Sequence, residues 1–281
     1  MKSLVIGDVS VDTIVHLATP LTSAATHFPV DTYQRIGGSA AGKALNLDYF
    51  HREVDLITRI GRDSVGKTIQ DRFKDTGVTP HFIETHEASI THTNYLAQTA
   101  ERISIFTSHP EVTLDAYYAQ YQSLIASADT LFLELSGGFH PWASQIKHPN
   151  VWVDLHDYDG VNPFMDPYIE LARVVVMSDV QLSQSSAHEI GVKLSRQKAA
   201  VIITHAARGL TLFENGQSYA YPLLNPTTPV DSDGAGDALI SALFHYWDEG
   251  LDSAIQKAMA HAAQVVMEKD LTLNKTPHTR G

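Results

Sequence analysis

The chain has 281 residues, 43% of them hydrophobic, so it can bury the core of one large α/β domain or two ordinary ones. It carries 20 Lys and Arg against 32 Asp and Glu, and a net charge of -12 repels nucleic acid and anionic membranes. The absence of cysteine excludes disulfides and thiolate chemistry. The strand-like N-terminus, and the lack of an apolar run of about 18 residues, predict a soluble cytoplasmic protein.

Short β-branched runs alternate with longer amphipathic stretches along the chain. We predict strands at 3–6, 54–58, 130–133, 151–153, 174–177 and 200–204, and helices at 38–50, 65–74, 114–126, 167–172, 187–195, 235–247 and 252–269. The dipeptide Asn215-Gly216 between two apolar runs indicates a β-hairpin. Strands that are apolar throughout and alternate with helices predict a mostly parallel sheet covered on both faces. Ligands of such folds bind beyond the carboxyl ends of the strands.

Two segments, 13–35 and 91–107, do not follow this rhythm. They contain alternating apolar and polar residues, as in Arg102-Ile103-Ser104-Ile105, and they directly follow candidate site residues. The alternation predicts extended strands outside the main sheet. We expect these strands to form a small β lid over a cleft; the ordinary alternative is peripheral strands that merely extend the sheet.

The segment Gly234-Ala235-Gly236-Asp237 lies between an extended run and an amphipathic helix. Small residues at a helix start leave backbone N–H groups uncovered, and these donors together with the helix dipole favour an anion. A carboxylate in the first turn can accept the proton of an attacking hydroxyl. The alternative is a tight loop in which Asp237 only caps the helix.

Four stretches, in chain order, carry a resemblance to a known family. They are Val5-Ile6-Gly7-Asp8-Val9-Ser10-Val11-Asp12, Gly37-Gly38-Ser39-Ala40-Ala41, Gly61-Arg62-Asp63-Ser64-Val65-Gly66 and Asp231-Ser232-Asp233-Gly234-Ala235-Gly236-Asp237. Together they resemble the ribokinase-like (PfkB) carbohydrate kinases, from about residue 3 to residue 269. The resemblance implies a three-layer α/β/α sandwich with a mostly parallel central sheet and a small β lid, in a single domain spanning 1–281.

The resemblance also implies roles at the acceptor side. Asp237 would be the general base, and the N–H groups of Gly234, Ala235 and Gly236 would form the anion hole. Asp12 and Gly38 would contact the acceptor. Arg102, next to Glu101, falls where the second lid strand returns toward the cleft and would also bind substrate.

At the nucleotide side, the resemblance implies ATP with Mg²⁺, and it leaves a monovalent cation open. Asp231 opens the last motif, near the phosphates and the site of such a cation. The nucleotide base would lie between the Thr204–Gly209 turn, which includes Ala206, and the last helices near Ala258 and His261. Packing between helices is the alternative role of Ala258 and His261.

Three departures from the family pattern stand out. Gly42 occupies the place of a substrate-binding Asn, and the following Lys43 would meet an anionic or unusually hydroxylated acceptor, or else be a solvated helix residue. Ser178 and Gln181 stand at the usual Asn-x-x-Glu position, which leaves the metal arrangement open. Ala206 replaces a glycine and would offer backbone contacts if its φ is negative.

The leading hypothesis is an ATP-dependent kinase that phosphorylates a hydroxymethyl group of a sugar or sugar-like molecule. One alternative is a nucleoside kinase of the same family, which an aromatic pair such as Tyr95 and Phe106 would favour. Another is a kinase-like binding or regulatory protein with weak or no turnover. P-loop and dinucleotide-binding motifs are absent from the sequence. We expect a small-molecule substrate, neither nucleic acid nor membrane as partner, and a possible homodimer through the lid.

Overall fold

The computed structural model describes residues 1–23, 25–97, 102–223 and 229–273. The chain forms two compact units. The first comprises Met1–Gly7, Asp55–Ile57 and Glu111–Thr227, and the second Asp8–Val54, Thr58–Pro110 and Thr228–Gly281. Strand β4 (Glu53–Gly61) gives its middle residues to the first unit and its ends to the second.

A mostly parallel sheet is the centre of the first unit. The strands follow the order β13-β12-β11-β10-β9-β8-β1-β4-β5, in which β5 belongs to the second unit. Their bounds are β1 Lys2–Ile6, β8 Thr130–Glu134, β9 Val151–Asp154, β10 Val174–Ser178, β11 Ala200–Thr204, β12 Leu210–Glu214 and β13 Gln217–Tyr221. Neighbours from β1 through β11 pair in parallel, whereas β12 and β13 are antiparallel. Strands β8 and β9 are buried throughout, as their unbroken apolar character predicts.

The hairpin predicted at Asn215-Gly216 joins β12 to β13. Both residues have positive φ, 51° and 78°, which is the twist that a tight hairpin turn requires. Helix α6 (Gln184–Ser195) packs on these strands, and a Cβ atom at Gly191 would lie 2.6 Å from the ring of Phe213. The unit also contains η1 (Asp115–Tyr117), α3 (Tyr118–Ser127), α4 (His140–Ala143), η2 (Pro163–Met165), α5 (Asp166–Leu171) and η3 (Ala206–Arg208).

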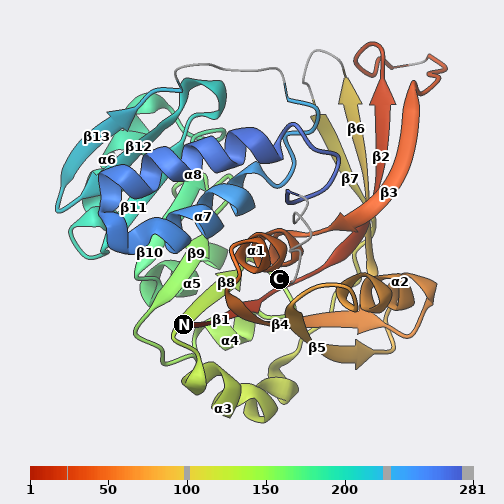
Figure 1. The fold of residues 1–281 in the computed structure, drawn as a ribbon, viewed down its shortest axis with the longest axis horizontal. Helices are drawn as coiled ribbons and strands as arrows, with labels where there is room; N and C mark the ends of the chain where they lie inside the picture. Colours follow the sequence, from red (N-terminus) through yellow and green to blue (C-terminus); the bar gives the residue numbers. More distant parts are fainter. Residues whose placement is uncertain (24, 98–101, 224–228, 274–281) are drawn as a thin grey trace, which may run out of the picture. The chain divides into compact units, whose positions relative to one another are not determined.

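Helices and a separate sheet build the second unit. Its helices are α1 (Ser39–Tyr49), α2 (Ser64–Phe73), α7 (Ala235–Tyr246), η4 (Trp247–Glu249) and α8 (Leu251–Val265). Helix α7 packs against both α8 and α1 (Figure 1). Strand β5 (Val78–Thr85) lies at the end of the strand order next to β4.

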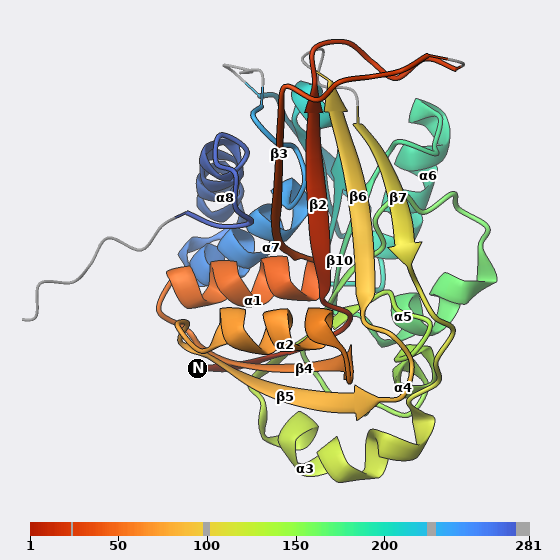
Figure 2. The same ribbon diagram turned by 90° about the vertical axis from the view of Figure 1, so that its right-hand side faces the viewer.

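Four strands of the second unit form a sheet of their own, which we call the lid sheet. They are β2 (Ser10–Leu17), β3 (Asp31–Gly37), β6 (Ile90–Ala97) and β7 (Arg102–Ser108), in the order β3-β2-β6-β7 (Figure 2). Cross-strand pairing places Asp12 beside His92, and His92 beside Phe106. Because side chains alternate between faces along a strand, these three residues share one face of the lid sheet.

Some elements differ from the sequence prediction. Strand β5 and the short helix α4 were not predicted; β5 contains Pro80 and lies at an edge of the sheet, where proline is tolerated. Helix α8 ends at Val265, four residues before the predicted end at Lys269. The chain turns there because the carbonyl of Val266 accepts hydrogen bonds from the N–H groups of Val230 and Asp231.

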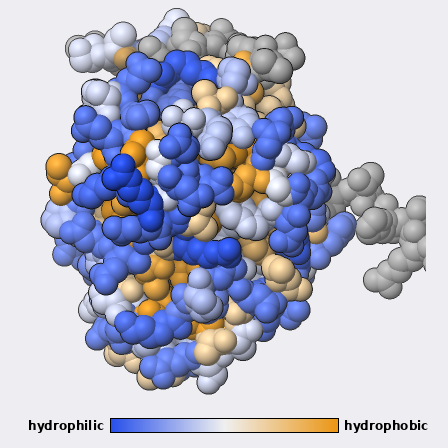
Figure 3. All heavy atoms as spheres, turned by 90° about the vertical axis from the view of Figure 1, so that its left-hand side faces the viewer, coloured by the Kyte–Doolittle hydropathy of each residue, from blue (hydrophilic) through white to orange (hydrophobic). Residues whose placement is uncertain are grey.

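The surface has the mixed character of an ordinary folded chain. On the face shown in Figure 3, hydrophobic residues form separate small patches between hydrophilic ones. Scattered exposed apolar residues of this kind are normal in globular proteins. Within the described ranges, the helices are too short or too polar to cross a lipid bilayer.

Substitution of Gly209 tests whether the backbone of the first unit requires a glycine at this position. It has φ 100°, and a Cβ atom there would lie 2.0 Å from the carbonyl oxygen of Tyr221. Gly209→Ala should lower the free energy of unfolding by roughly 2–4 kcal/mol, measured by urea denaturation. Gly137→Ala is the matched control, because a Cβ atom there meets nothing within 4 Å. Equal losses in the two variants would contradict the assignment of strain to Gly209.

Candidate functional site

A cavity of about 120 Å³ lies within the second unit, where the N-termini of α1 and α7 meet the lid sheet. Its lining residues are Asp12, Gly38, Ser39, His92, Asn94, Ser104, Asp233, Asp237 and Leu271. The cavity therefore brings together three predicted site residues, Asp12, Gly38 and Asp237, from distant parts of the sequence.

Both helices begin at a glycine in a left-handed conformation. Gly38 (φ 88°) precedes α1 and Gly234 (φ 83°) precedes α7. A side chain at Gly38 is also sterically excluded, because its Cβ atom would lie 2.6 Å from the carbonyl oxygen of Asp8. Neither glycine has a side chain to accept from the N–H groups of the first turn, which a helix leaves without intrahelical partners. These groups and the helix dipoles favour an anion at this end of the cavity.

Asp237 stands in the first turn of α7 and is 7% exposed. Its Oδ1 atom lies 2.6 Å from Nζ of Lys43, which projects from α1 and is 0% exposed. The alternative that Lys43 is a solvated helix residue is therefore wrong. Contact between Lys43 and an acceptor stays a prediction, and the burial of this side chain beside Asp237 argues against it.

Gly42 explains how α1 and α7 come close enough for this ion pair. A Cβ atom at Gly42 would lie 2.3 Å from Oδ2 of Asp237 and 2.8 Å from its Cβ atom. Any larger residue, including the Asn of the family pattern, would push against Asp237. The absence of a side chain at Gly42 thus makes room for the carboxylate, while substrate contact by Gly42 stays a prediction.

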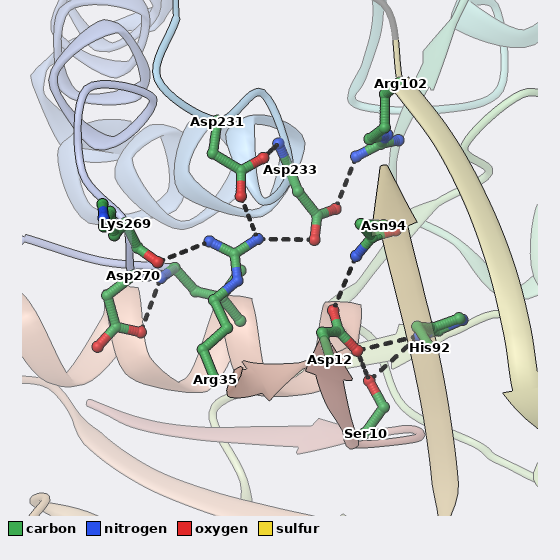
Figure 4. Close-up of polar contacts among 11 residues, drawn as sticks. Ser10, Asp12, Arg35, His92, Asn94, Arg102, Asp231, Asp233, Lys269 and Asp270 are labelled. Carbon is green, nitrogen blue, oxygen red and sulfur yellow. Dashed lines mark hydrogen bonds and ion pairs between the residues drawn. The ribbon is translucent and has the colours of Figure 1, made fainter. Parts of the chain in front are cut away.

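Asp12 is held in place by neighbours on the same face of the lid sheet (Figure 4). Its Oδ1 atom accepts a hydrogen bond from the hydroxyl of Ser10 at 2.6 Å and lies 3.1 Å from Nδ1 of His92. Its Oδ2 atom accepts from the amide of Asn94 at 3.4 Å. Gly37 leaves room for the carboxylate, since a Cβ atom there would lie 2.0 Å from Oδ2. The sequence analysis missed Ser10, His92 and Asn94, because only the strand register brings them beside Asp12.

Arg35 was also missed, and it connects the lid sheet to the loop before α7. Its Nη2 atom lies 2.8 Å from Oδ2 of Asp231 and 2.9 Å from Oδ2 of Asp233, and its Nη1 atom donates to the carbonyl of Lys269 (Figure 4). Burial lowers the pKa of Arg35, but Asp231 and Asp233 raise it by more, so that the net shift is upward. Arg102 of β7 donates to Oδ1 of Asp233 at 2.8 Å. Phosphate or cation binding by Asp231 and substrate binding by Arg102 stay predictions; Glu101 lies outside the described residues.

His261 has a clear packing role. The amide of Asn46 donates to the carbonyls of Gly42 and Leu271, so its Oδ1 atom accepts from Nε2 of His261 at 2.8 Å. Burial, helped by the charge of His245, lowers the pKa of His261 to about 4, so the ring is neutral at pH 7. His261 thus ties α8 to α1, and its contact with a nucleotide stays a prediction.

The predicted nucleotide turn lies in the first unit. Thr204 ends β11, and the N–H of His205 donates to the carbonyl of Gly209 at 2.8 Å, which closes a tight turn. The condition under which Ala206 would offer backbone contacts, a negative φ, is not met: its φ is 50°, in the left-handed region. Ala206 therefore adopts a conformation that glycine favours. Nucleotide contacts by Thr204, Ala206 and Gly209 stay predictions.

The turn after β10 does not fit direct ligation of magnesium. Ser178 ends the strand, and Gln181 is exposed and carries no charge. The carboxylate between them, Asp179, lies 2.8 Å from Nδ1 of His205 and 2.5 Å from Nη2 of Arg208. Although burial raises the pKa of Asp179, these two hydrogen bonds lower it by more. Mg²⁺ prefers free oxygen ligands, and the described part of the chain contains no cluster of three metal-ligating side chains.

Comparison with known proteins identifies the family. The sequence matches the model of the pfkB family carbohydrate kinases over residues 2–278. The chain belongs to this family. Members of this family are phosphotransferases that use an alcohol group as acceptor, which is the enzyme class expected from the sequence.

Three curated proteins illustrate its relatives. The chain is 24% identical to ribokinase from Haemophilus influenzae, over 94% of this chain and 92% of the relative. It is 25% identical to acarbose 7(IV)-phosphotransferase from Actinoplanes sp., over 90% and 88%. It is 26% identical to the bifunctional protein HldE of Pasteurella multocida, over 86% of this chain but 54% of the relative, so it spans about half of that protein.

Solved structures share the fold. A microbiome-derived acarbose kinase superposes with a TM-score of 0.83 at 21% identity, covering 98% of this chain and 95% of the other. Ribokinase from Thermotoga maritima gives 0.75 at 16% identity, covering 96% and 94%. A nucleoside kinase from Burkholderia thailandensis also gives 0.75 at 16% identity, covering 97% and 93%. The predicted ribokinase-like α/β fold is confirmed.

The two arginines that bind Asp233 should differ in their contribution to stability. Arg35→Met should lower the free energy of unfolding by roughly 3–5 kcal/mol, because it leaves Asp231 buried without its cation. Arg102→Met should cost about 0–1 kcal/mol, because the side chain of Arg102 is 37% exposed. Guanidinium denaturation of both variants measures the difference. A smaller loss in Arg35→Met than in Arg102→Met would contradict this ranking.

Proposed function

We propose that this chain is an ATP-dependent kinase that phosphorylates a hydroxymethyl group of a sugar or sugar-like molecule, with Asp237 as the general base. One observation carries the proposal: Asp237 borders a cavity that two glycine-capped helix N-termini and Asp12 also line. Phosphoryl transfer to an alcohol requires a base, an anion-binding helix end and a second carboxylate that binds hydroxyl groups.

The chemical step follows from these positions. The acceptor hydroxyl gives its proton to the carboxylate of Asp237 while its oxygen forms a bond to the γ-phosphorus of ATP. The bond from that phosphorus to the β–γ bridging oxygen breaks, and ADP leaves. The N–H groups of Gly234, Ala235 and Gly236, at the start of α7, stabilise the negative charge on the transferring phosphoryl group. Asp12, oriented by its neighbours, accepts a hydrogen bond from another hydroxyl of the acceptor.

The proposed donor is ATP carrying Mg²⁺. In kinases the metal neutralises charge on the phosphates. No step of the proposal depends on a metal held by protein side chains, since Asp179 is already paired and Ser178 and Gln181 are uncharged. A monovalent cation near Asp231 stays a prediction, and Arg35 already provides a positive charge there.

A sugar is favoured over a nucleoside as the acceptor. The aromatic pair predicted for stacking a base, Tyr95 and Phe106, does not form, because Phe106 pairs with His92 and Tyr95 pairs with Ile103 on the opposite face of the lid sheet. The cavity lining is polar apart from Gly38 and Leu271. Such a lining suits an acceptor with several hydroxyl groups.

A binding or regulatory protein without turnover is the alternative from a different class. The departures at Ser178, Gln181 and Ala206 motivated it. Asp237 lies in the first turn of a helix that begins after a glycine and borders the cavity, which supports a kinase instead. Measurement of turnover separates the two.

The decisive experiment is an ATP-consumption screen over sugars, sugar acids and nucleosides. Asp237→Asn should lower kcat by roughly 10²–10⁴-fold, because the acceptor proton loses its base. Asp248→Asn is the matched control, since Asp248 is exposed just beyond the same helix and should retain full activity. Absence of transfer by the unmodified chain to every acceptor would refute the kinase. Full activity of Asp237→Asn would refute the assignment of the base.

Substitution of Asp12 should weaken binding of the acceptor more than binding of ATP. Asp12→Asn should lower kcat/KM for the acceptor by roughly 10–100-fold, because a hydrogen bond to a charged group contributes about 1.5–3 kcal/mol. The KM for ATP should stay nearly constant. Thr13→Val is the matched control, because Thr13 lies on the same strand and points to the opposite face. If Asp12→Asn raised only the KM for ATP, Asp12 would belong to the nucleotide site.

A homodimer through the lid sheet and a cytoplasmic location stay predictions. Strand β7 forms an edge of the lid sheet, and its Ile103 and Ile105 are each 47% exposed. An unpaired edge with apolar residues is compatible with pairing to a second copy.

A further inference from the structure

A buried ammonium group lies against the proposed base. Nζ of Lys43 is 2.6 Å from Oδ1 of Asp237, and the Lys43 side chain is fully buried. Taking two charged groups out of water costs several kcal/mol each, and well-packed apolar residues in place of both partners of a buried ion pair are often neutral or stabilising. Ala40 and Leu47, which lie one turn before and one turn after Lys43 on α1, are buried and apolar, so apolar residues already pack on this side of the helix. The charge of Lys43 therefore needs an explanation other than stability.

The position of Lys43 beside Asp237 depends on the residue before it. Gly42 provides the space that the carboxylate fills, because a Cβ atom there would lie 2.3 Å from Oδ2 of Asp237. Gly42 and Lys43 thus act together: Gly42 leaves space for the carboxylate of Asp237, and Lys43 provides the opposite charge. This pairing gives a structural reason for the departure from the family pattern at Gly42.

Other charged and titratable groups surround the pair from each neighbouring element. The lid sheet contributes Asp12 and His92. The loop before α7 contributes Asp231 and Asp233, which form ion pairs with Arg35 and Arg102. Helix α8 contributes His261, which is hydrogen-bonded to Asn46 of α1. Ser241 of α7 donates to the carbonyl of Lys43 at 3.4 Å. Three carboxylates, Asp12, Asp233 and Asp237, line the cavity, and the ammonium group of Lys43 contacts Asp237.

We propose that Lys43 is a positioning residue that keeps Asp237 ionised and oriented at the cavity, and so sets the lower pH limit of phosphoryl transfer. This inference rests on the proposed function. An adjacent ammonium favours the charged form of a carboxylate, so Asp237 remains a proton acceptor at lower pH than it would alone. During transfer, the acceptor proton moves to Asp237, Lys43 retains its own protons, and the new oxygen–phosphorus bond replaces the bond to ADP.

The test measures kcat and KM as functions of pH for Lys43→Met, which has a similar length and no charge. The acid limb of the kcat profile should move to higher pH by roughly one to three units. At neutral pH, kcat should fall by about tenfold or more, while the KM for the acceptor should change much less. Lys67→Met is the matched control, because Lys67 is exposed on α2, and its profile should match that of the unmodified chain.

Stability measurements separate positioning from folding. Lys43→Met removes the ammonium group that lies 2.6 Å from Asp237, so its unfolding temperature should fall, and the double variant Lys43→Met/Asp237→Asn should recover part of that loss. Lys43→Arg retains the charge and should keep the acid limb near its original pH. If Lys43→Met does not fold, Lys43→Gln repeats the pH measurement with a neutral side chain.

The outcomes distinguish this inference from the proposed function. No transfer by the unmodified chain to any acceptor would refute the function itself. Transfer that requires Asp237, combined with an unchanged acid limb in the neutral Lys43 variants, would overturn the inference alone. Failure of both neutral variants to fold would assign Lys43 to stability and would overturn it as well.

Discussion

Carboxylates that line a largely buried cavity each need an opposite charge or a hydrogen-bond donor beside them. This requirement organises the candidate site. Asp237 faces Lys43 from α1, Asp233 faces Arg35 from the lid sheet, and Asp12 accepts a hydrogen bond from Ser10. Each partner comes from an element close in space. The same contacts that compensate the charges therefore hold α1, α7 and the lid sheet around the cavity.

Glycines make these close contacts possible. Gly37 leaves space for Asp12, and Gly42 leaves space for Asp237. Gly38 and Gly234 adopt positive φ and start the two helices whose N-termini border the cavity. The glycines at these two positions thus have a steric reason, since a methyl group at Gly37 or Gly42 would overlap a carboxylate oxygen.

The alternation of its strands decides which side chains of the lid sheet border the cavity. One face carries Asp12, His92 and Phe106, of which Asp12 and His92 line the cavity, whereas Tyr95 and Ile103 lie on the other face. The face that a side chain occupies depends on register, and a shift by one residue would exchange the two sets. This dependence is why Tyr95 and Phe106, which the sequence left open as an aromatic pair, lie on opposite faces although strands were expected in both lid segments.

The sequence by itself determined the family, the alternation of strands and helices, and the base Asp237 as a candidate, because short motifs and hydrophobic periodicity are local properties. The tertiary structure decided which charges meet. Nothing in the neighbourhood of Lys43 in the sequence indicates that it pairs with Asp237, and Arg35 lies far from Asp231 along the chain. Such contacts depend on helix packing and strand register, which bring together residues that no local pattern connects.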